Sequence, residues 1–122
     1  MSDGKVCNLS DAPPFAPLPG MSGQAVFGDQ LQLTLVTFAP NTVVPVHSHP
    51  QEQIGLLLRG AATVQLGQNE IALHTSSAYV VPGGVAHGLR VGHEGAVFVE
   101  AFHPGRQDYR DAAAGRPTQP FR

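Results

Sequence analysis

The 122-residue sequence is poor in cysteine, in charge and in long apolar runs, and each scarcity excludes a class of protein. Cys7 is the single cysteine, so no internal disulfide framework can form. Charged residues make up 13% of the chain, the net charge is −2, and no basic cluster is present. This composition gives no electrostatic surface for nucleic acid or for an anionic membrane. No apolar run approaches the roughly 18 residues that a membrane-spanning helix needs.

The N-terminal sequence MSDGKVCNLS lacks the apolar core of a signal peptide. Together with the single cysteine, this favours a soluble protein of the reducing cytoplasm, with neither nucleic acid nor membrane as a partner. The length predicts one domain, which is long enough to bury one core.

The sequence also shows hardly any apolar period near 3.6 residues, which argues against helices. It contains 14 glycines and 11 prolines, and short runs rich in Val, Leu, Phe and Thr lie between these turn-formers. The pattern predicts an all-β sandwich or small antiparallel barrel with a cavity at its mouth. The expected strands cover residues 24–27, 31–38, 42–47, 53–58, 61–66, 70–73, 78–81, 86–91 and 96–102.

Turn signals between these runs include RG at 59–60 and GHEG at 92–95. We expect residues 1–22 to form an extended N-terminal arm, because DAPPFAPLPG at 11–20 is proline-rich. Residues 23–104 form the predicted barrel domain. Residues 105–122 form a predicted C-terminal tail that is partly flexible, because little of it is apolar.

Two histidines stand one residue apart in VPVHSHPQEQIGLLLRG, at 44–60. Side chains alternate along a strand, so His47 and His49 point the same way if the strand runs through both. Gln53 has the same parity, and its amide oxygen is a neutral ligand. The best candidate for a further ligand is His87, after the Pro-Gly-Gly turn at 82–84. These four residues are the predicted metal ligands, and the alternative is a pair of exposed, pH-sensitive histidines.

At this point the chain resembles the cupin family. His47-x-His49-x3-Gln53-x6-Gly60 is similar to the first cupin motif, G-x5-H-x-H-x3,4-E-x6-G. Residues 82–87, PGGVAH, are similar to the second, G-x5-P-x-G-x2-H-x3-N. The resemblance implies a single cupin domain, a jelly-roll barrel also called a double-stranded β-helix, that binds one metal ion.

The sequence departs from the two motifs at four positions. Asn41 stands in place of the first glycine, which is tolerable because asparagine also adopts left-handed backbone conformations. Gln53 replaces the usual glutamate, Ser76 replaces a glycine, and Val91 replaces the final asparagine. None of these changes removes a histidine ligand.

A narrower resemblance links the chain to the small pectin-degradation monocupins, which convert 4,5-unsaturated uronate monosaccharides to linear keto forms. It is carried by HSHPQEQIGLLLRG, YVVPGGVAHGLRV and VEAFHPGRQDY. Those proteins also have glutamine at the fourth ligand position, and they carry an acid, a phenylalanine and an arginine near the last strand. Here the matching residues are Glu100, Phe102 and Arg106, so the resemblance implies that these three are catalytic. The usual acid is aspartate, and Glu100 is longer.

The residues themselves allow the same interpretation. Glu100 and Phe102 share one face of the final strand, so an inward-facing Glu100 would place a carboxylate in an apolar cavity. The alternatives are an outward Glu100 or a salt bridge with Arg106 or Arg90. Phe102 is otherwise plain core. Arg106 is either a solvated tail residue or a clamp for a carboxylate.

Three imidazoles and an amide leave the full charge of a divalent ion uncompensated, which favours an anionic chelating substrate. We therefore predict a metal-dependent isomerase or lyase acting on an unsaturated uronate or a similar carboxylated sugar. The ion is a divalent transition metal: nickel, iron, zinc, manganese or cobalt. A cupin dioxygenase and a non-catalytic sugar-binding protein remain alternatives.

The other residues receive simpler interpretations. Glu52 is expected to face solvent and becomes a ligand only if the strand register slips by one residue. Tyr79 is expected to pack or to lie at the rim. His74, His93 and His103 are expected at the surface, with His103 the likeliest of them to support the site. Edge strands and the proline-rich arm favour a homodimer.

Overall fold

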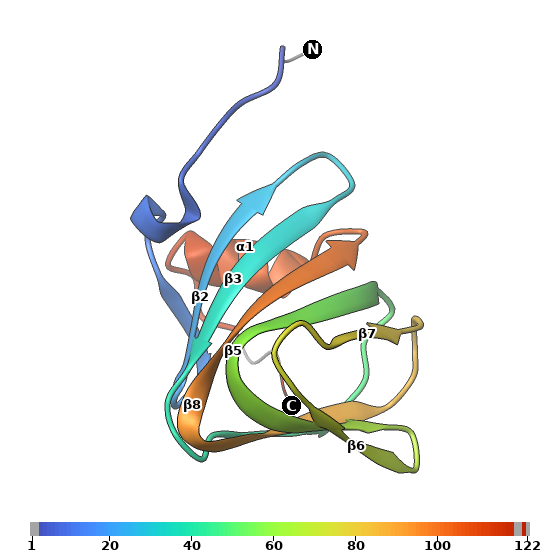
Figure 1. The fold of residues 1–122 in the computed structure, drawn as a ribbon. Helices are drawn as coiled ribbons and strands as arrows, with labels where there is room; N and C mark the ends of the chain where they lie inside the picture. Colours follow the sequence, from blue (N-terminus) through green and yellow to red (C-terminus); the bar gives the residue numbers. More distant parts are fainter. Residues whose placement is uncertain (1–2, 119–120, 122) are drawn as a thin grey trace.

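The computed structural model describes residues 3–118 and Phe121, and almost all regular structure in them is β-strand (Figure 1). The described strands form one antiparallel sheet that closes into a jelly-roll barrel, which confirms the predicted fold class. The elements in chain order are the 3-10 helix η1 (Leu9–Asp11), β1 (Phe15–Leu18), β2 (Met21–Phe27), β3 (Gln32–Phe38), β4 (Val43–His47), β5 (Glu52–Leu66), β6 (Asn69–Leu73), β7 (Ala78–Val81), β8 (His87–His103) and α1 (Gln107–Ala113).

The two long strands β5 and β8 form the centre of the barrel. They pair antiparallel along most of their length, so the first half of β5 lies beside the second half of β8. One half of this pair is flanked by β3 and β7, and the other half by β4 and β6. Both strands bend in the middle, as Figure 1 shows, and the sheet thereby curls into two layers around one interior.

The predicted chain reversals at 59–60 and 92–95 are wrong, because both strands continue through these residues. Gly60 has a φ of 95° and Gly95 a φ of 77°, values that glycine adopts without strain. The pairing register shifts on both sides of Gly60, and a Cβ atom there would overlap the carbonyl oxygen of Gly95. Glycine thus permits a bulged bend that carries the strand from one layer to the other.

The core lies between the two layers and follows the alternation of the strands. In β3, every second residue from Gln32 to Phe38 is buried, and the residues between them face outward. The largest fully buried apolar side chains are Tyr109, Phe98, Phe102, Leu57, Val36, Val64 and Val81. Two of these residues, Tyr109 and Val64, line the cavity of the candidate site.

Two segments outside the expected barrel take part in the structure. The strand β1 pairs with β2, and α1 packs against both of them, a helix that the sequence did not predict. The proposed boundaries at 22 and 104 stay predictions, and residues 119, 120 and 122 of the predicted flexible tail lie outside the described residues. Within the described part of the chain, no helix is long and apolar enough to cross a membrane.

Candidate metal centre

Three histidines from two segments of the chain meet in the barrel. His47 ends β4 and His87 begins β8, and the two are paired in register. His49 follows in the loop after β4. One ligand nitrogen from each ring lies within 4.8 Å of the others, so the structure brings the three predicted histidine ligands together.

Hydrogen bonds to the backbone select the tautomer of each ring. Each Nδ1 atom bonds to a carbonyl oxygen two residues away along the chain, at 2.8, 3.1 and 2.9 Å for His47, His49 and His87. A carbonyl only accepts, so Nδ1 carries the proton and Nε2 keeps its lone pair. Burial lowers the pKa of His47 and of His49 to about 4, and it also lowers the pKa of His87. At neutral pH the rings are therefore in the neutral form that binds metals.

Two observations indicate that these residues fit a bound cation. The Nε2 atom of His87 is buried and has no hydrogen-bond partner among the described residues, which is costly unless something else occupies its lone pair. The Nε2 atom of His49 faces Oε1 of Gln53 at 3.0 Å. Both atoms are acceptors in the tautomer described above. A cation between such convergent lone pairs would satisfy all of them.

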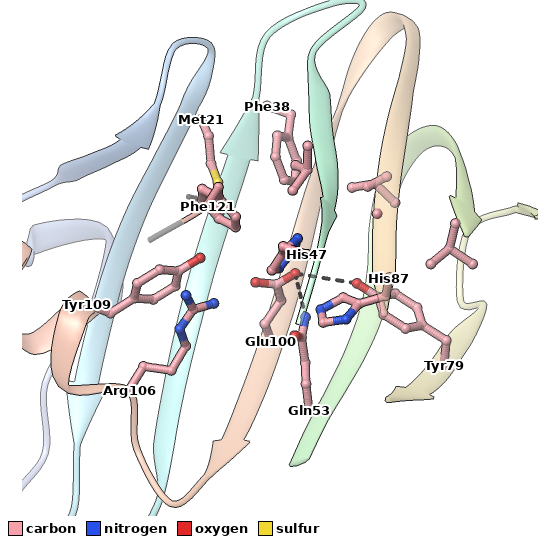
Figure 2. A pocket seen from close by; sticks show the side chains of 14 residues that line it. Met21, Phe38, His47, Gln53, Tyr79, His87, Glu100, Arg106, Tyr109 and Phe121 are labelled. Carbon is pink, nitrogen blue, oxygen red and sulfur yellow. Dashed lines mark hydrogen bonds between the residues drawn. The ribbon is translucent and has the colours of Figure 1, made fainter. Parts of the chain in front are cut away.

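Gln53 is held in place by a buried acid. Its side-chain NH2 group donates to Oε2 of Glu100 at 3.2 Å, which turns its amide oxygen toward His49. Glu100 is 5% exposed, and it also accepts a hydrogen bond from the Tyr79 hydroxyl at 3.4 Å. Figure 2 shows this chain of contacts across the cavity. Burial raises the pKa of Glu100 to about 7, although the nearby Arg106 charge and the Tyr79 hydrogen bond act in the opposite direction.

Tyr79 reaches Glu100 because a glycine lies between them. In the pairing register Gly55 is opposite both residues, Tyr79 on β7 and Glu100 on β8. A Cβ atom at position 55 would overlap the Tyr79 ring. The inward-facing glycine therefore allows the ring to cross the strand. The burial of Tyr79 agrees with the expected packing, but its hydrogen bond to Glu100 was not predicted, because that contact depends on the β5–β7 register. The pattern of an inward Gly55 beside an apolar run was the available signal.

Arg106 lies inside the protein rather than in a solvated tail, with 2% exposure at the start of α1. Asp108 accepts two hydrogen bonds from its guanidinium, at 3.0 and 2.8 Å. The guanidinium carbon lies 4.0 Å from the Tyr109 ring centroid and 5.4 Å from that of Phe102. The backbone N–H of Arg106 donates to Gln32 at 2.8 Å. Sequence reasoning missed these supporting residues, although an acid two positions after an arginine at a helix start was a signal for the ion pair.

The remaining predicted residues divide into buried and exposed groups. Phe102 is buried, and its ring contacts both His49, at 5.8 Å between the ring centroids, and the guanidinium of Arg106, at 5.4 Å. Glu52 is exposed, which confirms that the register favours Gln53. The three other histidines are all exposed: His74, His93 and His103.

Most of the polar candidate residues line one cavity. Its polar wall contains His47, His87, Gln53, Glu100 and Arg106. The opposite lining is apolar and includes side chains from β2, β3 and β4, as Figure 2 shows. A polar, partly charged wall facing an apolar one is typical of a site for a small polar ligand.

The profile of the cupin domain matches residues 34–102, which is more than half of the chain. The protein belongs to the cupin family. Auxin-binding protein 1 from Arabidopsis thaliana is 29% identical to this cupin over 106 residues, which is 73% of this chain but only 54% of the plant protein. The chain thus spans about half the length of that relative.

Other similar proteins are matched over most of their own length. Pectin degradation protein KdgF from Dickeya dadantii (strain 3937) is 29% identical over 84 residues, covering 68% of this chain and 76% of that protein. KdgF from Halomonas sp. superposes with a TM-score of 0.81 at 24% identity, over 87% of this chain and 98% of that one. An RmlC-like cupin from Shewanella frigidimarina also gives 0.81, at 20% identity, covering 88% and 96%. The similarity to KdgF supports the resemblance that the motifs indicated.

Both glycine positions that this cupin has replaced keep the left-handed backbone. Asn41 has a φ of 63° and Ser76 a φ of 75°. Asparagine adopts this region readily, whereas serine does so less often. The two turns before the metal motifs thus keep their conformation without glycine.

Proposed function

We propose that this cupin is a metal-dependent enzyme that opens the ring of a 4,5-unsaturated uronate monosaccharide and tautomerises it to the linear keto form. The observation that carries the proposal is the buried carboxyl group of Glu100. It bonds to Gln53, which lies against the histidines, and it shares a cavity with Arg106. A proton carrier and a cation beside a metal site suit an acidic sugar. Similarity to two KdgF proteins supports the same substrate class.

In this proposal His47, His49, His87 and Gln53 hold a divalent transition-metal ion. When bound, the ion acts as a Lewis acid for the carboxylate and ring oxygens of the substrate. Because the four ligands are neutral, they leave its positive charge available for an anion. The hydrogen bonds on the three Nδ1 atoms would leave each Nε2 lone pair available to the ion.

The reaction is an internal transfer of one proton. The C1–O5 bond of the cyclic hemiacetal breaks, the C1 hydroxyl gives up its proton to form an aldehyde, and O5 becomes an enolate oxygen at C5. Transfer of that proton to C4 then converts the enolate to a ketone, so the C4–C5 double bond disappears and neither water nor oxidant is consumed. We assign Glu100 as the group that carries the proton, since a pKa near 7 suits both acceptance and donation.

The remaining proposed roles concern positioning. Arg106 supplies positive charge for the substrate carboxylate, and Asp108 holds the guanidinium at the cavity wall through two hydrogen bonds. Phe102 packs between the His49 ring and Arg106 and keeps water out of that gap. Tyr79 holds Oε2 of Glu100 from the other side.

An ultraviolet assay tests the proposed activity. Protein loaded with nickel, iron, zinc, manganese or cobalt is mixed with 4,5-unsaturated galacturonate, and the absorbance of the conjugated double bond is followed. We expect the absorbance to fall at the same rate in air and under nitrogen, with a linear keto acid identified by NMR. A requirement for oxygen would support the dioxygenase alternative, and binding without any conversion would support the sugar-binding one.

We also propose that the working unit is a homodimer, which is supported by an apolar row on the outer face of the sheet. Leu33, Ala101, Ile54 and Val80 are neighbours across β3, β8, β5 and β7. Leu33, Ile54 and Val80 are 40–52% exposed. Such a row on a sheet face can pack against the same row of a second copy.

Sedimentation velocity tests this dimer with Ile54→Lys. We expect the wild type to sediment as a dimer and the variant as a monomer, because a lysine in the middle of the row would be buried without a partner. Ile71→Lys is the matched control, since Ile71 is 46% exposed on β6 and lies outside the row. A monomeric wild type, or a dimer that survives the Ile54 change, would rule this interface out.

A further inference from the structure

The ring of Phe121 lies in the cavity of the candidate metal centre, although it belongs to the C-terminal segment beyond α1 (Figure 2). It meets the His47 ring edge to face, with 4.7 Å between the ring centroids. The guanidinium carbon of Arg106 lies 5.6 Å from its centroid, and the Tyr109 ring lies at 6.5 Å. Phe121 therefore contacts both a candidate metal ligand and the candidate anion-binding arginine.

These contacts place the ring in the space that an anionic ligand would use. A carboxylate that reaches both the metal site at His47 and the charge of Arg106 would meet the Phe121 ring. A phenyl ring cannot ligate a metal, and it attracts a guanidinium only through its quadrupole. A carboxylate does both more strongly, through coordination and charge-assisted hydrogen bonds. An anion can thus displace the ring, because it binds both the metal site and the guanidinium more strongly than the ring does.

Phe121 is also held less firmly than the other aromatic residues of the site. Phe102 and Tyr109 are each 1% exposed, and they belong to β8 and α1. Phe121 is only half-buried, and residues 116–118 before it have no regular secondary structure. Among the described residues, the contacts of Phe121 are those of its ring with His47, Arg106 and Tyr109.

We propose that the Phe121 side chain occupies the substrate cavity in the absence of ligand and is displaced when an anionic ligand binds. The Phe121 ring and the ligand then compete for the space between His47 and Arg106, and the ring restrains the site until a ligand binds. The identity of the ligand as a uronate rests on the proposed function, whereas the docking of the ring does not. The alternative is that the ring is a fixed part of the cavity wall and contributes to ligand binding. Removing the ring would raise the ligand affinity under the proposal and lower it under this alternative.

The position of the Phe121 side chain can be tested with Phe121→Trp, because the chain contains no tryptophan of its own and the introduced one gives the only tryptophan emission. We expect its emission to be partly shielded from acrylamide and to be quenched by Ni²⁺ or Co²⁺, since position 121 lies beside His47. His87→Ala in the same background should remove the quenching by metal. Phe27→Trp is the matched control, because Phe27 packs under Arg110 and does not line the cavity. Emission equal to that of free tryptophan, with no shielding, would overturn the proposal.

Displacement of the side chain at position 121 is then measured by adding one of two unreactive ligands to the metal-loaded protein. D-galacturonate has the charge of a uronate but no double bond, and oxalate chelates divalent metals of any kind. We expect either ligand to shift the emission of Phe121→Trp to the red and to raise its acrylamide quenching, while Phe27→Trp stays unchanged. Unchanged emission of Phe121→Trp at saturating oxalate would show that the ring is not displaced.

The ligand affinity of a variant without the ring distinguishes the two possibilities. By calorimetry we expect Phe121→Ala to bind these ligands at least about tenfold more tightly than the wild type, the factor for an open state populated at about 10% or less. Phe27→Ala should leave the affinity unchanged. Weaker binding by Phe121→Ala would establish the fixed wall instead. Failure of the uronate assay with these results intact would overturn only the proposed substrate, since oxalate reports displacement without any turnover.

Discussion

His87→Ala is expected to abolish stoichiometric binding of divalent metal. His87 contributes the buried Nε2 atom that has no partner among the described residues, and it lies opposite His47 in the sheet register. Loss of a residue that merely supports a ligand costs about 10–100-fold in metal affinity, so loss of a ligand itself should cost at least about 100-fold. Calorimetric titration and metal analysis of the purified protein measure the effect.

Thermal unfolding distinguishes the loss of a metal-ligating side chain from the loss of the folded structure. Metal at about 1,000 times its dissociation constant stabilises the protein that binds it by about 4 kcal/mol. The wild type should therefore melt at a higher temperature with metal than without it. At the same metal concentration a site about 100-fold weaker is only about tenfold above its dissociation constant, so the metal should stabilise His87→Ala by at most about 1.4 kcal/mol and raise its melting temperature much less. His74→Ala, at an exposed position, should behave as the wild type. Metal affinity unchanged in His87→Ala would contradict the assignment of the site.

Glu100→Gln is expected to lower the turnover of unsaturated uronate by about 10²- to 10⁴-fold while metal binding persists. Glutamine has the same shape, and its amide oxygen can still accept the hydrogen bonds that Gln53 and Tyr79 donate. It cannot carry a proton at neutral pH. The change therefore removes the chemistry and keeps the position of Gln53 beside His49.

Steady-state kinetics and metal titration on the same samples check this result. Glu94→Gln is the control, because Glu94 lies on the same strand but is exposed. We expect kcat to fall in Glu100→Gln with little change in KM, since the proton moves only during the reaction. Turnover close to that of the wild type would remove Glu100 from the mechanism, even if the metal site stands.

Part of the candidate site could be predicted from the sequence because strand alternation is a local property, although the strand does not run through both histidines: β4 ends at His47 and His49 lies in the loop. The parity of Gln53 against Glu52 needed only the two-residue period of a strand, and the structure has Gln53 buried and Glu52 exposed. The left-handed conformation of Asn41 was expected from the motif position of glycine, and Ser76, which also replaces a motif glycine, adopts it as well. His47 and His87 were linked by motif spacing, and their pairing in register confirms that the two segments are neighbours.

The features that sequence reasoning missed depend on contacts between distant segments. A glycine with positive φ permits either a chain reversal or a bulged bend, so Gly60 alone could not distinguish them; its contact with Gly95 on β8 does. Tyr79 reaches Glu100 only because β7 and β8 lie on the two sides of Gly55. Phe121 enters the cavity from beyond the barrel, and no strand period or motif extends that far along the chain.

Turnover measured against metal occupancy decides whether this cavity is a metal-dependent active site. Chelator-treated protein is reloaded in steps, and the bound metal per chain and the rate of loss of unsaturated galacturonate are measured on each sample. The rate should be zero without metal and rise in proportion to occupancy, up to one ion per chain. Full turnover in protein that contains no metal, or no turnover at full occupancy, would contradict the proposed function.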